Sequence, residues 1–235
     1  MKLVKDRRQA VRTMAVRRMA LVAVFCAVAY VCQFLFSFKV AFLTFDAKDA
    51  VMTVGAMFFG PLWGIVMSLI VALLEMVTSG SGTGFYGFIM NFLSSAVFSA
   101  LAAWIYRYKH TLLGAILGLT ASVFGMTAVM LVFNLLITPL YMGGTTAEVA
   151  AMIPTLLLPF NLVKALFNAG LVLVLYKPIS TALKRAKLLH GEHAEKAKFD
   201  KKSIPVLIAG VLLVVLCLVV FLVLLHGTVE WGTGT

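Results

Sequence analysis

Charged residues are scarce in this sequence. Asp, Glu, Lys and Arg make up 12% of its 235 residues, whereas 62% are hydrophobic. A soluble domain is typically about a quarter charged and about half apolar. The polar surface available here is too small to keep a compact body of this size in solution. The composition therefore excludes a soluble domain and predicts an integral membrane protein, in which each span needs ~20 mostly apolar residues.

Cysteines and catalytic motifs are scarce as well. Cys26, Cys32 and Cys217 lie inside apolar runs without metal-ligand spacing, so we expect no disulfide and no metal site. The chain has neither the Gly-x-x-x-x-Gly-Lys-Ser/Thr phosphate-binding loop nor the His-Glu-x-x-His zinc motif. No acid–base pair is evident within the apolar runs. We therefore expect no catalytic residues, no cofactor and no ATP hydrolysis by this chain itself.

Long apolar runs make up most of the sequence and predict an all-α membrane bundle. Gly60-Pro61 and the Gly/Ser/Thr stretch 78–84 are typical helix-breaking segments between them. The expected helices are Met19–Phe38, Ala50–Gly60, Leu62–Val77, Phe85–Tyr106, Leu112–Tyr141, Pro154–Tyr176 and Ile204–Leu225. The second run is short, so we expect a half-length or tilted helix there. The pattern predicts a six-helix bundle plus one extra C-terminal transmembrane helix.

Charge divides the chain into segments and orients it. We expect a basic N-terminal segment at 1–18, a six-helix membrane domain at 19–185, a charged linker at 186–203, an additional transmembrane helix at 204–226 and a tail at 227–235. Threading the spans puts 17 of the 20 Lys and Arg residues on one side. The positive-inside rule makes that side cytoplasmic. The N-terminus and linker are then cytoplasmic, and the tail is external if all seven runs span. Because this orientation accounts for the net charge of +11, we expect no nucleic-acid partner.

Polar side chains within or beside the apolar runs are the candidates for function, because a charge inside a membrane is costly and usually has a partner or a role. Threading places four such groups in the outward half of the bundle. They are Asp46 with Lys48 and Asp49, Glu75, Asn91 with Ser94 and Ser95, and Asn134 with Lys164.

Structural explanations remain open for the first three groups. Asp46 or Asp49 could accept backbone N–H groups at a helix N-terminus in a solvated loop. Glu75 could be an interfacial carboxylate, or it could form an ion pair with a basic neighbour such as Lys48. Asn91 could bond to a neighbouring helix, as amides in membrane bundles commonly do.

The fourth group favours a binding pocket. Asn161, Lys164 and Asn168 follow i, i+3, i+7 spacing and share one helix face. Lys164 lies about ten residues into its run, too deep to snorkel easily to water. A buried structural pair with Asn134 is one reading. The other is a polar pocket that receives a ligand from outside.

Small residues mark the first expected helix. Ala23 and Ala27 form a small-x-x-x-small pair, which permits the close approach of another helix. That helix could belong to this bundle or to a separate membrane protein.

These features together resemble the substrate-binding S components of energy-coupling factor (ECF) vitamin transporters, and most of all the riboflavin-specific ones. The matching pieces are Leu43-Thr44-Phe45-Asp46 before the second helix, Gly60-Pro61 after it, Asn134 with Pro139-Leu140-Tyr141, and Lys164 on the sixth helix. The resemblance covers about residues 15 to 185.

The resemblance implies a role and partners. An S component of the bacterial plasma membrane captures a vitamin from outside. It pairs through first-helix alanines, here Ala23 and Ala27, with a transmembrane coupling subunit and two ABC-type ATPases. The resemblance implies Asn134 and Lys164 at the polar edge of the flavin, and Glu75, Asn91 and Asn161 at the ribityl hydroxyls. The residues expected around the ring are Phe45, Phe85, Tyr86 and Phe160, and Asp46, Lys48 and Tyr141 are further members of the site.

Other readings remain. The block around Asp46 and Glu75 is more charged than a neutral vitamin requires. The ligand could therefore be another nutrient, such as thiamine, folate, pantothenate or a queuosine precursor. A membrane structural or sensory protein, whose polar groups only hold helices together, is the alternative outside transport.

Overall fold

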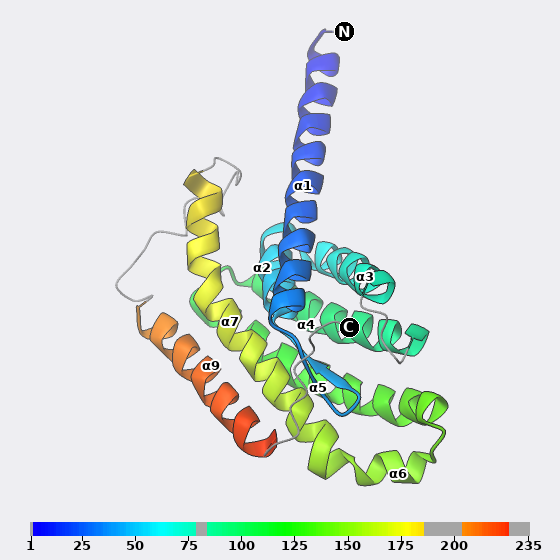
Figure 1. Cartoon of the computed structure of the whole chain (residues 1–235). Helices are drawn as coiled ribbons and strands as arrows, with labels where there is room; N and C mark the ends of the chain where they lie inside the picture. Colours follow the sequence, from blue (N-terminus) through cyan, green and yellow to red (C-terminus); the bar gives the residue numbers. More distant parts are fainter. Residues whose placement is uncertain (1, 79–83, 186–203, 226–235) are drawn as a thin grey trace.

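The computed structural model describes residues 2–78, 84–185 and 204–225, which form a helical bundle with one β-hairpin (Figure 1). The predicted linker 186–203 and tail 227–235 lie outside the described residues. The longer helices are α1 (Lys2–Leu35), α2 (Lys48–Phe59), α3 (Pro61–Thr78), α4 (Gly84–Tyr108), α5 (Leu112–Met142), α7 (Leu158–Arg185) and α9 (Ile204–Leu225). A short helix α6 (Thr146–Ala151) and a π-helical turn η1 (Ile153–Leu157) join α5 to α7.

Six helical segments within the described residues are long and apolar enough to cross a membrane. Five belong to the predicted six-helix block and the sixth is α9. The remaining member of the block is α2, which has 12 residues and is about 18 Å long at 1.5 Å per residue. It is the half-length helix that the short second run predicted, and the membrane-bundle fold class is confirmed.

Helix ends follow the sequence breaks in most places. Gly60 ends α2 with a φ of 107°, a conformation that favours glycine, and Pro61 begins α3, where its missing N–H costs no helical hydrogen bond. Thr111 caps α5 by accepting a hydrogen bond from the Gly114 N–H. The first helix differs from expectation, because α1 begins at Lys2, before the predicted Met19, and ends at Leu35. Phe38 therefore lies outside it.

Contacts between distant helices agree with the predicted threading. The Tyr30 hydroxyl of α1 donates to the Thr78 hydroxyl at 2.8 Å, so the C-terminal ends of α1 and α3 lie together. The hydroxyls of Tyr106 on α4 and Tyr176 on α7 are 2.6 Å apart. The N-terminal part of α1 projects beyond the rest of the bundle (Figure 1).

A β-hairpin, which the sequence did not predict, connects α1 to α2. Strands β1 (Phe38–Val40) and β2 (Leu43–Phe45) are antiparallel, with Phe38 opposite Phe45 and Val40 opposite Leu43. The chain reverses over Ala41, whose φ of 52° is left-handed, and the next residue. Phe38 and Phe45 stack with ring centroids 4.9 Å apart. Three-residue strands without a turn glycine leave little periodic signal, which is why the sequence did not predict them.

Two apolar cores hold these elements together. The bundle core is shared by six helices, α1, α2, α3, α4, α5 and α7, and α2 is buried within it. The second, which we call the hairpin core, consists of Val40, Leu43, Phe45, Val149, Leu157, Phe160, Val163, Cys217 and Phe221. It joins the hairpin to α6, η1, α7 and α9. Phe45 belongs to the hairpin core and Ala50 to the bundle core, so the chain between them crosses from one core to the other.

Candidate functional site

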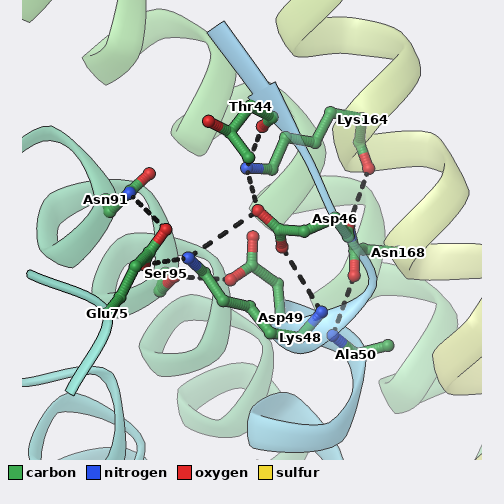
Figure 2. Close-up of polar contacts among 10 residues, drawn as sticks. All are labelled: Thr44, Asp46, Lys48, Asp49, Ala50, Glu75, Asn91, Ser95, Lys164 and Asn168. Carbon is green, nitrogen blue, oxygen red and sulfur yellow. Dashed lines mark hydrogen bonds and ion pairs between the residues drawn. The ribbon is translucent and has the colours of Figure 1, made fainter. Parts of the chain in front are cut away.

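A buried ionic network surrounds the crossing from β2 into α2 (Figure 2). Its five charged members are Asp46, Lys48, Asp49, Glu75 and Lys164. Thr44, Asn91, Ser95 and Asn168 complete it with hydrogen bonds. All five charged side chains are buried, and Asp46 is 0% exposed. The solvated-loop explanation for Asp46 and Asp49 is therefore wrong, although Asp46 Oδ1 does accept the Lys48 backbone N–H at 3.3 Å.

Lys164 ties α7 to the hairpin. Its Nζ donates to Asp46 Oδ2 at 2.9 Å and to the Thr44 backbone oxygen at 2.9 Å. Lys48 Nζ lies 3.7 Å from the same Asp46 oxygen. The two lysines thus share one carboxylate, and an ion pair joins residues that are 118 positions apart.

A second ion pair extends the network to α3 and α4. Lys48 Nζ donates to Glu75 Oε2 at 2.6 Å, which confirms the pairing expected as a structural explanation for Glu75. Asn91 Nδ2 donates to the other Glu75 oxygen at 2.8 Å. One turn further along α4, the Ser95 hydroxyl donates to Asp49 Oδ1 at 2.5 Å.

Asn168 fixes the backbone of the crossing. Its Oδ1 accepts the Ala50 N–H at 2.9 Å, which satisfies a donor that the N-terminus of α2 leaves unpaired. Its Nδ2 donates to the Asp46 backbone oxygen at 2.9 Å. Lys164 and Asn168 are one helical turn apart, so a single face of α7 holds both the side chain and the backbone of this segment.

The network contains three carboxylates and two ammonium groups, an acid–base assembly that the sequence reading did not expect in the membrane. Burying any of these charges alone would cost several kcal/mol, and mutual pairing with added hydrogen bonds offsets that cost. Within the described residues, no three His, Cys, Asp or Glu side chains are arranged to hold a metal ion. Lys164 Nζ uses two of its three N–H donors within the network and keeps one that could serve a polar ligand.

The other predicted site residues make their contacts outside this network. Asn134 Nδ2 donates to the Met130 backbone oxygen of its own helix, and its Oδ1 accepts from Thr138. Tyr141 donates to Thr138 at 3.4 Å. The rings of Tyr141 and Tyr86 are 6.0 Å apart.

Asn161 and Phe45 are also buried. Asn161 donates to the backbone oxygen of Leu157, the last residue of η1. The Phe45 ring packs in the hairpin core against four other rings, those of Phe38, Phe160, Phe167 and Phe221.

Several buried polar groups retain hydrogen-bonding capacity. A side-chain amide carries two N–H donors, and the contacts described for Asn134 and for Asn161 use one each. The Ser94 and Thr127 hydroxyls are buried with no partner among the described residues. These groups belong to α4, α5 and α7, and α5 packs against both other helices. Buried polar groups are normally satisfied, so these groups are candidates to bond a polar ligand or water.

The two small residues on α1 lie on a different surface. Ala23 and Ala27 are both exposed, so they do not pack within this bundle as the first explanation held. Their exposure is compatible with docking of another membrane protein, which stays a prediction.

Sequence reasoning missed three parts of the site: the Asp46–Lys164 pair, the Ser95–Asp49 bond and the role of Asn168. The pair had a usable signal. Two opposite charges in apolar surroundings are expected to form an ion pair. The other two depend on how α4 and α7 pack against the crossing, which no local pattern encodes.

Comparisons with known proteins agree with this architecture. Residues 17–176 match the family described as "ECF transporter, substrate-specific component". The riboflavin transporter RibU of Staphylococcus aureus (strain TCH60) is 29% identical over 179 residues, which cover 72% of this chain and 93% of RibU. The riboflavin transporter FmnP of Bacillus subtilis (strain 168) is 24% identical, covering 65% of this chain and 86% of FmnP.

A solved structure supports the same assignment. The chain in "Structure and mechanism of the S component of a bacterial ECF transporter" superposes with a TM-score of 0.62 at 27% identity, covering 73% of this chain and 99% of the solved one. The apolar helices and the family make this a multi-pass protein of the plasma membrane and a transporter component rather than an enzyme. The chain belongs to the family of substrate-specific S components of ECF transporters.

Proposed function

We propose that this chain captures riboflavin or a related flavin from outside the cell, for ATP-driven uptake by partner subunits. In this proposal the N-terminus is cytoplasmic, and the C-terminus is external if all seven runs span. A transmembrane coupling subunit docks on the face of α1 that carries Ala23 and Ala27, and two ABC-type ATPases supply the energy.

One observation carries the proposal. Lys164, Asn134 and Asn161 are buried polar side chains with donors left over, in a chain whose relatives RibU and FmnP are riboflavin transporters. A flavin ring is largely apolar, and its polar edge offers carbonyl oxygens and an imide N–H. An ammonium donates to such an edge, and an amide both donates and accepts.

Each predicted site residue is assigned a role that fits its contacts. We assign Asn134 and Lys164 to the flavin edge, and Glu75, Asn91 and Asn161 to the ribityl hydroxyls. Tyr86 and Tyr141 flank the ring. Three residues support the site: Phe45, whose ring already packs against other rings, Asp46, which holds Lys164, and Lys48, which holds Glu75.

A cationic nutrient such as thiamine is the second candidate. Three carboxylates face two ammonium groups in the ionic network, which leaves one surplus negative charge if all five ionise. A cation would benefit from that surplus.

A titration decides between the candidates. The purified protein in lipid nanodiscs is titrated with riboflavin, and binding is read from quenched flavin fluorescence. Thiamine, folate and pantothenate are titrated in parallel by calorimetry. We expect saturable binding of riboflavin alone. Binding of thiamine instead would favour the second candidate, and binding of none of the four would contradict the flavin assignment.

Asn134→Leu tests the pocket directly. The change removes the amide while keeping a similar volume, and it breaks bonds only within α5. We expect riboflavin affinity to fall about tenfold to a hundredfold, the effect of leaving a buried polar partner unsatisfied. Leu136→Ala, on the exposed face of the same helix, is the control and should bind normally. Equal affinity of the Asn134 variant and the control would remove Asn134 from the site.

A further inference from the structure

Helix α9 is seated closely on α7, although it lies beyond the residues 17–176 that match the family. The two helices run side by side in Figure 1. They approach at Gly170 and Gly210. A Cβ built on Gly170 would lie 3.1 Å from the Gly210 backbone oxygen, and a Cβ on Gly210 would lie 3.1 Å from the Gly170 backbone oxygen. Larger side chains at these positions would force the helices apart.

The contact uses one stripe of α9. Gly210, Cys217 and Phe221 are buried, and their i, i+7, i+11 spacing puts them on one helix face. The other faces present exposed aliphatic residues to lipid, among them Leu212, Leu216, Val219, Leu222 and Val223.

The end of this stripe contacts the hairpin. The Phe221 ring lies 4.7 Å from the Phe38 ring and 4.5 Å from the Phe45 ring, measured between centroids. Phe45 directly precedes Asp46, whose carboxylate pairs with Lys164. Lys164 also holds the backbone oxygen of Thr44. The hairpin is thus held by α9 through rings and by α7 through an ammonium group.

We propose that α9 is a latch on the β1–β2 hairpin and that Phe221 is a positioning residue for the site. By fixing Phe38 and Phe45, Phe221 keeps Asp46 against Lys164 and slows the departure of the ligand. The proposal rests on the proposed function for its ligand. The latch itself can be measured without one.

The first experiment measures riboflavin release from the full chain in nanodiscs. Excess unlabelled competitor is added and the fluorescence recovery is followed. Phe221→Ala should speed release by about tenfold, because it removes two ring–ring contacts and leaves a cavity beside the hairpin. Leu222→Ala is the matched control, since Leu222 is the adjacent residue and is exposed. Phe221→Leu, which keeps an apolar side chain, should restore most of the wild-type rate.

The second experiment needs no ligand. Amide hydrogen exchange of the peptide spanning residues 38–45 should quicken in Phe221→Ala and stay unchanged in Leu222→Ala. Gly210→Leu should have the same effect by displacing α9, whereas Ala209→Leu, on the exposed side, should not.

Unchanged exchange in both Phe221→Ala and Gly210→Leu would overturn the latch, whether or not riboflavin binds. Failure of the wild-type chain to bind riboflavin would overturn only the proposed ligand. If Phe221→Ala does not fold, Gly210→Leu against its control Ala209→Leu carries the same comparison.

Discussion

Asn168 links three segments with one amide group. It accepts from Ala50 and donates to the backbone oxygens of Asp46 and Lys164. On the face predicted to hold Asn161, Lys164 and Asn168, the last two therefore hold the crossing, while Asn161 bonds to Leu157 at the end of η1. The same face of α7 serves both structure and proposed binding. A single substitution on it must therefore be compared with a double variant that also changes the bonded residue.

The substitution Lys164→Met tests the ion pair between Lys164 and Asp46. It leaves the buried Asp46 carboxylate without its closest ammonium group, which should lower the free energy of unfolding by about 3–5 kcal/mol. The double variant Lys164→Met with Asp46→Asn removes both charges and should recover most of that loss. Thermal unfolding in nanodiscs measures both, with Lys39→Met, an exposed lysine, as the control. A double variant no more stable than Lys164→Met alone would contradict the pairing.

At the scale of elements, the close packing of α4 and α5 depends on small residues. A Cβ on Gly118 would lie 2.8 Å from the Ala102 backbone oxygen, which cannot move without shifting α4. A Cβ on Gly125 would meet the methyl end of the Leu101 side chain, which can rotate away. Two glycines of one helix thus differ in what surrounds them.

This difference predicts opposite outcomes for the same substitution. Gly118→Ala should destabilise the protein by about 1–3 kcal/mol through overpacking. Gly125→Ala should be neutral or slightly stabilising, because alanine favours a helix over glycine by about 1 kcal/mol. Thermal unfolding of the two variants side by side is the measurement. Equal losses would mean that α4 and α5 do not meet at Gly118 as described.

Some elements of the fold could be predicted from the sequence and others could not. Apolar runs and the Gly60-Pro61 break predicted the long helices and the half-length α2. The hairpin was missed because Ala41 makes its turn without a glycine signal. The Lys48–Glu75 pair was expected from the sequence and is present. The Asp46–Lys164 pair was missed, although two opposite charges in apolar surroundings were a usable signal for it. Contacts made by tertiary packing, such as Ser95 with Asp49, leave no trace in local pattern.

At the scale of the whole molecule, the exposed alanines of α1 are the candidate docking face. Replacing both Ala23 and Ala27 with leucine should abolish co-purification with a co-expressed coupling subunit and its ATPases, because larger side chains block close helix approach. Riboflavin affinity and thermal stability should be unchanged, since both positions are exposed in this chain. Val24→Leu with Val28→Leu, ~100° further around the helix, is the control. Retained co-purification of the alanine variant would place the docking surface elsewhere.

Helix α2 is only 12 residues long and begins at Lys48, which is buried inside the molecule. The N-terminus of a helix carries the equivalent of about half a positive charge from its aligned peptide dipoles. Asp46 and Asp49 lie at that end. The backbone therefore offsets about half of the single surplus negative charge of the side chains. A cation entering the site would be attracted less than the five ionisable groups suggest, and the site as a whole is better matched to a neutral ligand.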